Sequence, residues 1–176
     1  MNDFISIVIL QYNNSHYTKD LLRSLSNVDY KNFRTIIIDN NSSDNSLSDI
    51  KNYFKDQKKE FFSIIDNEGK FIKNDLRKSD TYVIESLKNG GYSFGCNLGL
   101  KLSQVLGSDY YLILNNDVEV EPDFLKHLIQ FSKSNPQMGM ISSKIYFHEN
   151  QNLIWFNGGK INSFSGKVMH YDFKKE

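Results

Sequence analysis

Short apolar runs alternate with segments of helical periodicity along this chain, and that alternation restricts the possible folds more than any other feature of the sequence. The runs Ile5–Leu10 and Phe33–Ile38 are rich in β-branched residues and almost continuously apolar, as expected of strands that are covered on both faces. Residues 16–25 and the segment from Ser46 onward carry apolar side chains at helical spacing. A strand–helix–strand–helix order predicts a parallel sheet with right-handed crossovers.

Further elements follow the same order with less regularity. A helix is predicted over Asn97–Val105 from the helical spacing of its apolar residues. Another is predicted from about Pro122 to Ser132, because proline is favoured in the first turn of a helix. Strands are predicted at Tyr82–Glu85, Tyr110–Leu114, Met140–Phe147, Leu153–Phe156 and Lys167–Tyr171.

The segment between the second predicted helix and Tyr82 has the pattern of a β-hairpin. Phe61–Ile65 and Lys70–Ile72 flank Asp66-Asn67-Glu68-Gly69, in which Gly69 stands at a position that needs a positive φ. With this hairpin as an insertion, the sequence predicts an α/β fold: a Rossmann-like three-layer sandwich with a mainly parallel central sheet. No repeat or linker divides the chain, so residues 1–176 are predicted to form a single domain.

Composition excludes several classes of function. Lys and Arg together number 21, as do Asp and Glu, so nothing supports a groove that neutralises nucleic-acid phosphates. Ile5–Leu10 is too short to span a membrane and lacks the cationic flank of a signal peptide, which favours a cytoplasmic location. The single cysteine, Cys96, excludes an internal disulfide and a multi-cysteine metal site, and it is expected to be a small buried hydrophobic residue.

Three of the predicted parallel strands end in polar side chains. Gln11-Tyr12-Asn13 follows the first, Asp39–Asn41 follows the second, and Asn115-Asn116-Asp117 follows Tyr110–Leu114. The carboxyl ends of parallel strands lie along one edge of an α/β sheet, where such folds bind ligands. Three polar strand ends at one edge therefore predict a binding site.

Each of these residues also has a structural interpretation. Tyr12 fits a half-buried aromatic and a base-stacking platform equally well. Asp39 and Asp44 can cap the helix that starts near Ser46, and for Asp44 capping is the favoured interpretation. Asn89-Gly90-Gly91 fits a tight turn, although glycines also allow close approach of a ligand. It matches no Walker or Rossmann phosphate motif.

Four segments, in this order and spacing, resemble the motif set of glycosyltransferase family 2, and most of all its rhamnosyltransferase-like members. They are Ser6–Asn13, Ile37–Asp44, Asn89–Gly99 and Leu112–Asp117. The resemblance implies a nucleotide-sugar-binding fold of the GT-A type, a divalent cation, and transfer of a sugar with inversion at the anomeric carbon. It also suggests a role in polysaccharide biosynthesis, with peripheral association at the inner face of the membrane left open.

The resemblance also assigns residues to the site. Tyr12 and Asp39 would surround the nucleoside, the loop Asn89–Asn97 would lie beside the nucleotide and donor sugar, and Asn115-Asn116-Asp117 takes the place of the Asp-x-Asp motif. The implied nucleotide-sugar-binding residues are Gln11, Tyr12, Asn13, Asp39, Asn41, Asn89, Gly91, Asn97, Asn115 and Asn116. The implied donor is a UDP-, dTDP- or GDP-sugar, and the acceptor a saccharide or a lipid-linked acceptor.

Asp117 is the implied metal ligand, and the chemistry agrees with that role. A diphosphate leaving group gains negative charge as the glycosidic bond breaks, and Mg²⁺ or Mn²⁺ stabilises that charge as a Lewis acid. Such cations often bind only one or two protein carboxylates beside the substrate phosphates. Asn115 departs from the motif, because it stands where the first Asp is expected. The site therefore has one negative charge fewer and is expected to hold the metal weakly before the nucleotide arrives.

No convincing general base follows these motifs. Inverting transfer requires a base that deprotonates the acceptor hydroxyl, and Asp172 is only a nominal candidate. We therefore expect the donor-binding, N-terminal part of a longer enzyme, with a naturally short and inactive relative as the alternative. A non-catalytic nucleotide- or carbohydrate-binding module also stays open. A sugar-phosphate nucleotidyltransferase is less favoured, since residues 10–16 contain no Gly, Lys or Arg for a phosphate loop.

Overall fold

The chain forms two compact units, Met1–Pro122 and Asp123–Glu176. The structure is a computed structural model that describes residues 3–66, 68–73 and 76–175. Each unit is described by itself below. Within these residues, no helix combines the length and the apolar character needed to cross a membrane.

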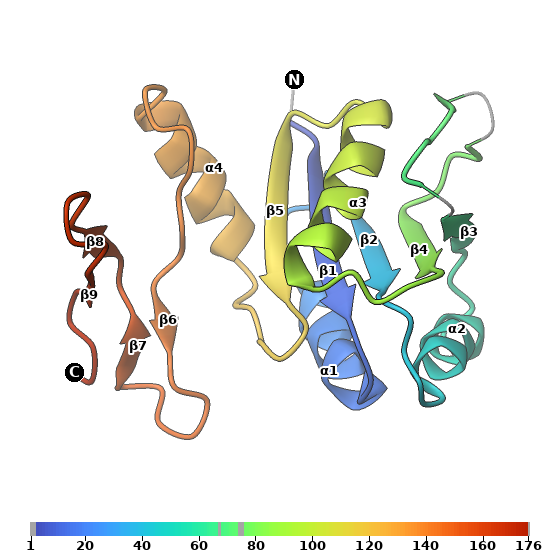
Figure 1. The fold of residues 1–176 in the computed structure, drawn as a ribbon, viewed down its shortest axis with the longest axis horizontal. Coiled ribbons are helices and arrows are strands. Elements are labelled where there is room, and N and C mark those ends of the chain that lie inside the picture. The colour runs from blue at the N-terminus through green and yellow to red at the C-terminus, as the bar shows by residue number, and fades with distance from the viewer. Residues whose placement is uncertain (1–2, 67, 74–75, 176) are drawn as a thin grey trace. The chain divides into compact units, whose positions relative to one another are not determined.

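A parallel sheet forms the centre of the first unit (Figure 1). Its described strands are β1 (Ile5–Gln11), β2 (Phe33–Asp39), β3 (Phe62–Asp66), β4 (Thr81–Ser86) and β5 (Tyr110–Asn115). They lie in the order β3-β4-β2-β1-β5, and every neighbouring pair is parallel. Because β2 lies on one side of β1 and β5 on the other, the chain reverses its direction of winding at β1, as at the ligand-binding crevice of open α/β sheets.

Helices cover both faces of this sheet. They are α1 (Ser15–Ser26), α2 (Ser46–Asp56) and α3 (Tyr92–Val105). In Figure 1, α3 lies on the near face, while α1 and α2 pack side by side, joined by a hydrogen bond of 2.9 Å from Ser15 Oγ to Asp49. The predicted α/β sandwich with a mainly parallel sheet is thus confirmed.

The core under α3 depends on a close approach between helix and sheet. Its buried members are Val8, Ile36, Ile38, Tyr82, Ile84, Leu98 and Leu102. At Gly99, a Cβ atom would lie only 2.4 Å from Cγ1 of Val8 and 2.8 Å from Cδ1 of Ile38. Glycine therefore lets α3 lie closer to the sheet than any larger residue would allow.

The predicted β-hairpin insertion is wrong. β3 pairs in parallel with β4 as an edge strand of the main sheet, with Phe62 opposite Tyr82, and Lys70–Ile72 form no strand. Phe62 and Ile64 pack against the core under α3, and this burial favours pairing with β4 over a local hairpin. Gly69 does have a positive φ of 67°. Asn67, in the predicted turn, lies outside the described residues.

The second unit contains one described helix and four short strands. Their bounds are α4 (Phe124–Ser134), β6 (Ile145–Tyr146), β7 (Ile154–Phe156), β8 (Gly159–Ile161) and β9 (Val168–His170). β6 pairs with β7 and β8 with β9, both antiparallel. Of the strand predicted over Met140–Phe147, only the end is present, as β6. The sequence did not predict β8, because the glycines at its start favour a turn.

Candidate functional site

The polar strand ends identified in the sequence lie next to one another at one edge of the main sheet. In the parallel register, Gln11 at the end of β1 lies opposite Asp39 at the end of β2. On the other side of β1, Leu10 lies opposite Asn115 at the end of β5. The three polar segments thus belong to three neighbouring strands.

Gln11 connects these strand ends through its side chain. It is completely buried, and its Oε1 accepts hydrogen bonds from the Thr18 hydroxyl of α1 and from Asn116 Nδ2, the latter at 3.2 Å. Its Nε2 donates to the backbone oxygen of Asn13 at 2.6 Å. Since both polar atoms of its side chain form hydrogen bonds within the protein, Gln11 holds Asn13 and Asn116 in position.

Asp39 forms the turn that follows β2. The side chain is only 3% exposed, and its oxygens accept from the Ser42 backbone N–H at 3.0 Å and the Ser42 hydroxyl at 2.6 Å. Ser42 Oγ in turn accepts from the backbone N–H of Asn13 at 2.9 Å. The loops after β1 and β2 are therefore joined. Asn13 and Asn41 have φ angles of 55° and 59°, a left-handed conformation that Asn tolerates better than most residues.

Asp44 has the capping role predicted for it. Its carboxylate accepts from the backbone N–H groups of Ser46, the first residue of α2, and of Asn14, both at 2.9 Å. The side-chain hydroxyl of Ser46 first, and then these two backbone N–H groups, hold the pKa of Asp44 below its ordinary value. Asp44 is thus fully engaged in local structure.

Asn40 anchors the glycine-containing loop before α3. Its side chain is buried; Nδ2 donates to Asn89 Oδ1 at 3.0 Å and to the Gly91 oxygen at 3.3 Å. Asn89 Oδ1 also accepts from the Gly91 backbone N–H at 3.0 Å. Gly91 has a φ of 82°, so it provides the left-handed turn into α3. Asn89 and Gly91 are thereby tied to the end of β2.

A second group of side chains gathers at the end of β5. The Tyr92 hydroxyl, on the first residue of α3, donates to Asn115 Oδ1 at 2.9 Å. Burial raises the pKa of the Tyr92 phenol, and the thiol of Cys96 and the charge of Asp117 raise it further. Tyr92 therefore stays neutral and able to donate at physiological pH. Cys96 is buried and unbridged, as predicted from the sequence.

Asp117 is exposed and free to bind a ligand. Within the described residues its carboxylate makes no hydrogen bond or ion pair, in contrast to Asp39 and Asp44. The same residues contain no group of three or more His, Cys, Asp or Glu side chains that could hold a metal ion. A single unpaired carboxylate fits a Mg²⁺ or Mn²⁺ ion that takes its remaining ligands from phosphates and water.

Among the described residues, three of the predicted nucleotide-sugar-binding residues, Tyr12, Asn41 and Asn97, make no side-chain hydrogen bond to the network. Tyr12 is 48% exposed at the end of β1, so one part of its side chain is open to solvent. Asn97 is exposed in the second turn of α3 and lines a hollow of about 450 Å³ together with Phe94, Lys101 and Tyr111. Tyr12 thus adjoins the polar strand ends, whereas Asn97 faces a different surface of the unit.

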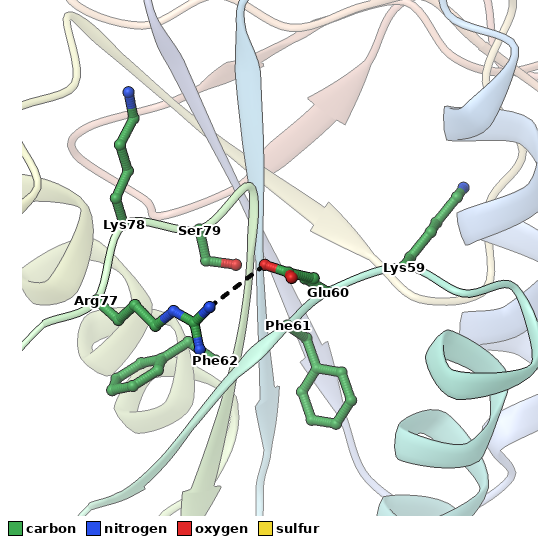
Figure 2. Close-up of a pocket in the computed structure, with 7 residues that line it drawn as sticks. All are labelled: Lys59, Glu60, Phe61, Phe62, Arg77, Lys78 and Ser79. Atoms are coloured by element: carbon green, nitrogen blue, oxygen red, sulfur yellow. Dashed lines mark ion pairs between the residues drawn. The ribbon is translucent and has the colours of Figure 1, made fainter.

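Another hollow lies at the opposite edge of the sheet (Figure 2). It measures about 240 Å³ and is lined by the start of β3 and by residues that precede β3 and β4: Lys59, Glu60, Phe61, Phe62, Arg77, Lys78 and Ser79. Arg77 Nη2 lies 3.7 Å from Glu60 Oε2. In Figure 2, Lys59 and Lys78 lie on opposite sides of this ion pair. Because it adjoins the amino ends of the strands, this hollow is separate from the polar edge described above.

In the second unit, Asp172 is held in local structure. One carboxylate oxygen accepts from Asn157 Nδ2 at 2.8 Å, and the other lies 2.9 Å from Lys175 Nζ. These contacts, with Lys175 first, lower the pKa of Asp172 below its ordinary value. A carboxylate with a lowered pKa is a weaker base, so this geometry does not favour Asp172 as the base of a transfer reaction.

Sequence reasoning missed four residues that hold the candidate site together: Thr18, Asn40, Ser42 and Tyr92. For Thr18 a signal was present, because it lies at helical spacing with Leu21, Leu22 and Leu25 on the buried face of α1. A polar residue in an apolar helical stripe indicates a buried hydrogen bond. Tyr92 gave no such signal, since its partner is 23 residues away in the chain.

Comparison with known proteins agrees with this architecture. The family model described as "Glycosyl transferase family 2" matches residues 6–174. None of the curated proteins matches the chain.

Solved structures with the same fold include the mannosyltransferase PcManGT from Pyrobaculum calidifontis in complex with GDP-Man and Mn²⁺, at 14% identity and a TM-score of 0.64 over 84% of this chain. A crystal structure of TarS from S. aureus has 18% identity and a TM-score of 0.55 over 81%. TarS in complex with UDP-GlcNAc has 17% identity and a TM-score of 0.56 over 81%. The chain spans only 36%, 39% and 40% of these three structures, respectively.

Proposed function

Since the chain belongs to glycosyltransferase family 2, we propose that it supplies the donor-binding part of an inverting glycosyltransferase. The enzyme transfers a hexosyl or rhamnosyl group from a nucleotide diphosphate sugar to a hydroxyl group of a saccharide or lipid-linked acceptor. The observation that carries this proposal is the hydrogen-bonded edge formed by the ends of β1, β2 and β5, at which Asp117 is exposed and makes no hydrogen bond or ion pair with any described residue.

The loops after β1 and β2 bind the nucleoside in this proposal. Tyr12, about half exposed beside these loops, offers a ring on which a base can stack, while Asn13 and Asp39 are fixed by Ser42. A carboxylate has about four lone-pair sites, and Ser42 uses two of those on Asp39, so further acceptor capacity remains for the base or ribose. Asn41 and the Asn89–Gly91 loop adjoin the same edge.

The end of β5 binds the diphosphate. Asp117 holds a divalent cation, and Asn115 and Asn116 lie beside it in the chain. Once bound, the cation stabilises the negative charge of the departing diphosphate as a Lewis acid. The complexes of the mannosyltransferase with GDP-Man and Mn²⁺ and of TarS with UDP-GlcNAc support a nucleotide-sugar donor and a cation for this chain as well.

The acceptor's general base is not assigned. Asp172, the nominal candidate, is paired with Lys175 and Asn157 and is a weak base for that reason. The donor-binding residues can thus act without a complete catalytic centre. We expect this chain to bind nucleotide while transferring sugar weakly or not at all.

Calorimetry with UDP, dTDP and GDP, each with and without Mn²⁺, tests the donor site. We expect one of the three to bind, and to bind more tightly with Mn²⁺. Failure of all three to bind in either condition would exclude the donor-site proposal.

A second assay separates an enzyme from a non-catalytic binding module. Transfer of a labelled sugar from the donor whose nucleotide binds is measured with saccharide and lipid-linked acceptors. Slow transfer that is lost in Asp117→Ala supports the enzyme. Tight nucleotide binding without any transfer, in a protein that contains the whole family-2 domain, favours the binding module.

A further inference from the structure

One hydrogen bond joins the start of α3 to the strand end that carries Asp117. The Tyr92 hydroxyl donates to Asn115 Oδ1 at 2.9 Å. Tyr92 is the first residue of α3 and Asn115 the last residue of β5, so the contact connects the start of the helix to the end of the strand. Within the described residues, the Asn115 amide makes no other side-chain hydrogen bond.

This contact orients the two polar groups of the Asn115 amide. A carboxamide is planar, with an acceptor oxygen on one side and a donor NH₂ group on the other. Because Oδ1 accepts from Tyr92, the Nδ2 group is turned away from Tyr92 and keeps both of its protons. An NH₂ group has no lone pair for a cation, so this side of Asn115 binds an oxygen atom, while Oδ1 keeps its second lone pair.

Tyr92 is placed to hold this orientation from the start of a helix. The left-handed turn at Gly91, with its φ of 82°, immediately precedes Tyr92 and is itself anchored by Asn40. The hydroxyl is therefore presented from a fixed helix start, although the Tyr92 side chain is 53% exposed.

We propose that Tyr92 is a positioning residue of the nucleotide site, which turns the Asn115 NH₂ group toward an oxygen atom of the bound donor. The proposal rests on the proposed function, because it deepens the account of the same site. It divides the strand end into two roles: Asp117 binds the cation, and Asn115 donates a hydrogen bond to a phosphate or ribose oxygen. Compared with the expected Asp, the Asn at position 115 thereby adds a hydrogen-bond donor to the strand end.

A double-mutant cycle tests whether Tyr92 acts through Asn115. The dissociation constant of the nucleotide diphosphate that binds the wild-type protein is measured with Mn²⁺ for wild type, Tyr92→Phe, Asn115→Ala and the double variant. Loss of one hydrogen bond predicts a rise of about fivefold in Kd for Tyr92→Phe. In the Asn115→Ala background the same substitution should change Kd less than twofold. Tyr111→Phe, which removes a similarly exposed hydroxyl from β5, is the matched control and should bind like wild type.

Binding of the corresponding nucleoside distinguishes the two sources of the oxygen. If Tyr92→Phe also weakens nucleoside binding, the oxygen belongs to the ribose; if only diphosphate binding is weakened, it belongs to a phosphate. Either result supports the proposal. An unchanged Kd in Tyr92→Phe, or an equal loss in the Asn115→Ala background, would overturn it while leaving the proposed function intact. Absence of nucleotide binding by the wild-type protein would overturn both.

Discussion

Asn116 Nδ2 lies 3.2 Å from Gln11 Oε1, and this hydrogen bond joins the carboxyl ends of β5 and β1. Asn116 Nδ2 is also 3.2 Å from the Thr18 hydroxyl, which itself donates to Gln11. Gln11 and Thr18 are completely buried. Because Asp117 directly follows Asn116, the proposed metal ligand is held in place by a polar network that is anchored on two buried residues.

Removal of the Thr18 hydroxyl should therefore affect both stability and binding. Thr18→Val keeps the shape of the side chain but leaves Gln11 Oε1 with one donor fewer, so we expect the free energy of unfolding to fall by about 1–3 kcal/mol. Nucleotide binding with Mn²⁺ should weaken as well. Urea unfolding and calorimetry measure the two effects. Thr18→Ser, which retains the hydroxyl, should keep its nucleotide affinity; equal affinities in the two variants would show that the network does not position the site.

Gly99 should not tolerate a methyl group. In Gly99→Ala the new Cβ would lie 2.4 Å from Val8 Cγ1, a separation that forces α3 or the sheet to move. Overpacking of this kind costs about 1–3 kcal/mol, measurable as a lower urea midpoint. Gly139→Ala, where no atom lies within 4 Å of the added methyl, is the control and should unfold close to wild type. A wild-type midpoint in Gly99→Ala would contradict the close packing.

Glu85 should make the first unit more stable at neutral than at acidic pH. Burial acts to raise the pKa of Glu85, but hydrogen bonds from Lys51 Nζ at 2.5 Å and Ser63 Oγ at 2.7 Å outweigh it, and the net pKa is lowered. A lowered pKa stabilises the fold at pH values above about 4.3, the ordinary pKa of glutamate. This stabilisation disappears as the pH falls through the pKa that Glu85 has in the folded protein.

Glu85→Gln removes that contribution. We expect it to lower the free energy of unfolding by about 1 kcal/mol at neutral pH. The difference from wild type should shrink steadily below about pH 4. Urea unfolding across this range measures it, and Glu121→Gln, an exposed side chain, is the control. A difference that stays constant with pH would mean that the ionised Glu85 carboxylate is not its source.

The regular part of the fold was predictable because its hydrophobic periods are unambiguous. Ile5–Leu10 and Phe33–Ile38 became β1 and β2 nearly at the predicted bounds, and the helical spacing of Leu21, Leu22 and Leu25 identified α1. Local patterns failed where tertiary packing decides the structure. α3 begins at Tyr92 instead of Asn97, because Gly95 is used for close packing against Leu10 and does not end the helix.

The position of the candidate site was predictable, but its internal connections were not. The convergence of three polar strand ends follows from parallel topology alone. The sequence does not reveal that Gln11 is completely buried, or that Asn40 reaches the loop at Asn89, since these contacts depend on side-chain direction between segments distant in the chain. Tyr92 and Asn115 fall in separate motifs, so their pairing appears only in three dimensions.

The dependence of nucleotide affinity on Mn²⁺ tests the central claim most directly. Calorimetry compares wild type, Asp117→Asn and the control Glu119→Gln, an exposed acidic side chain of the same loop. In wild type and control, Mn²⁺ should tighten binding of the nucleotide diphosphate by about tenfold or more, equivalent to about 1.4 kcal/mol. In Asp117→Asn this gain should vanish while the thermal midpoint stays unchanged, because Asp117 is exposed. An undiminished Mn²⁺ effect in Asp117→Asn would contradict the assignment of Asp117 as the metal ligand of a nucleotide-sugar site.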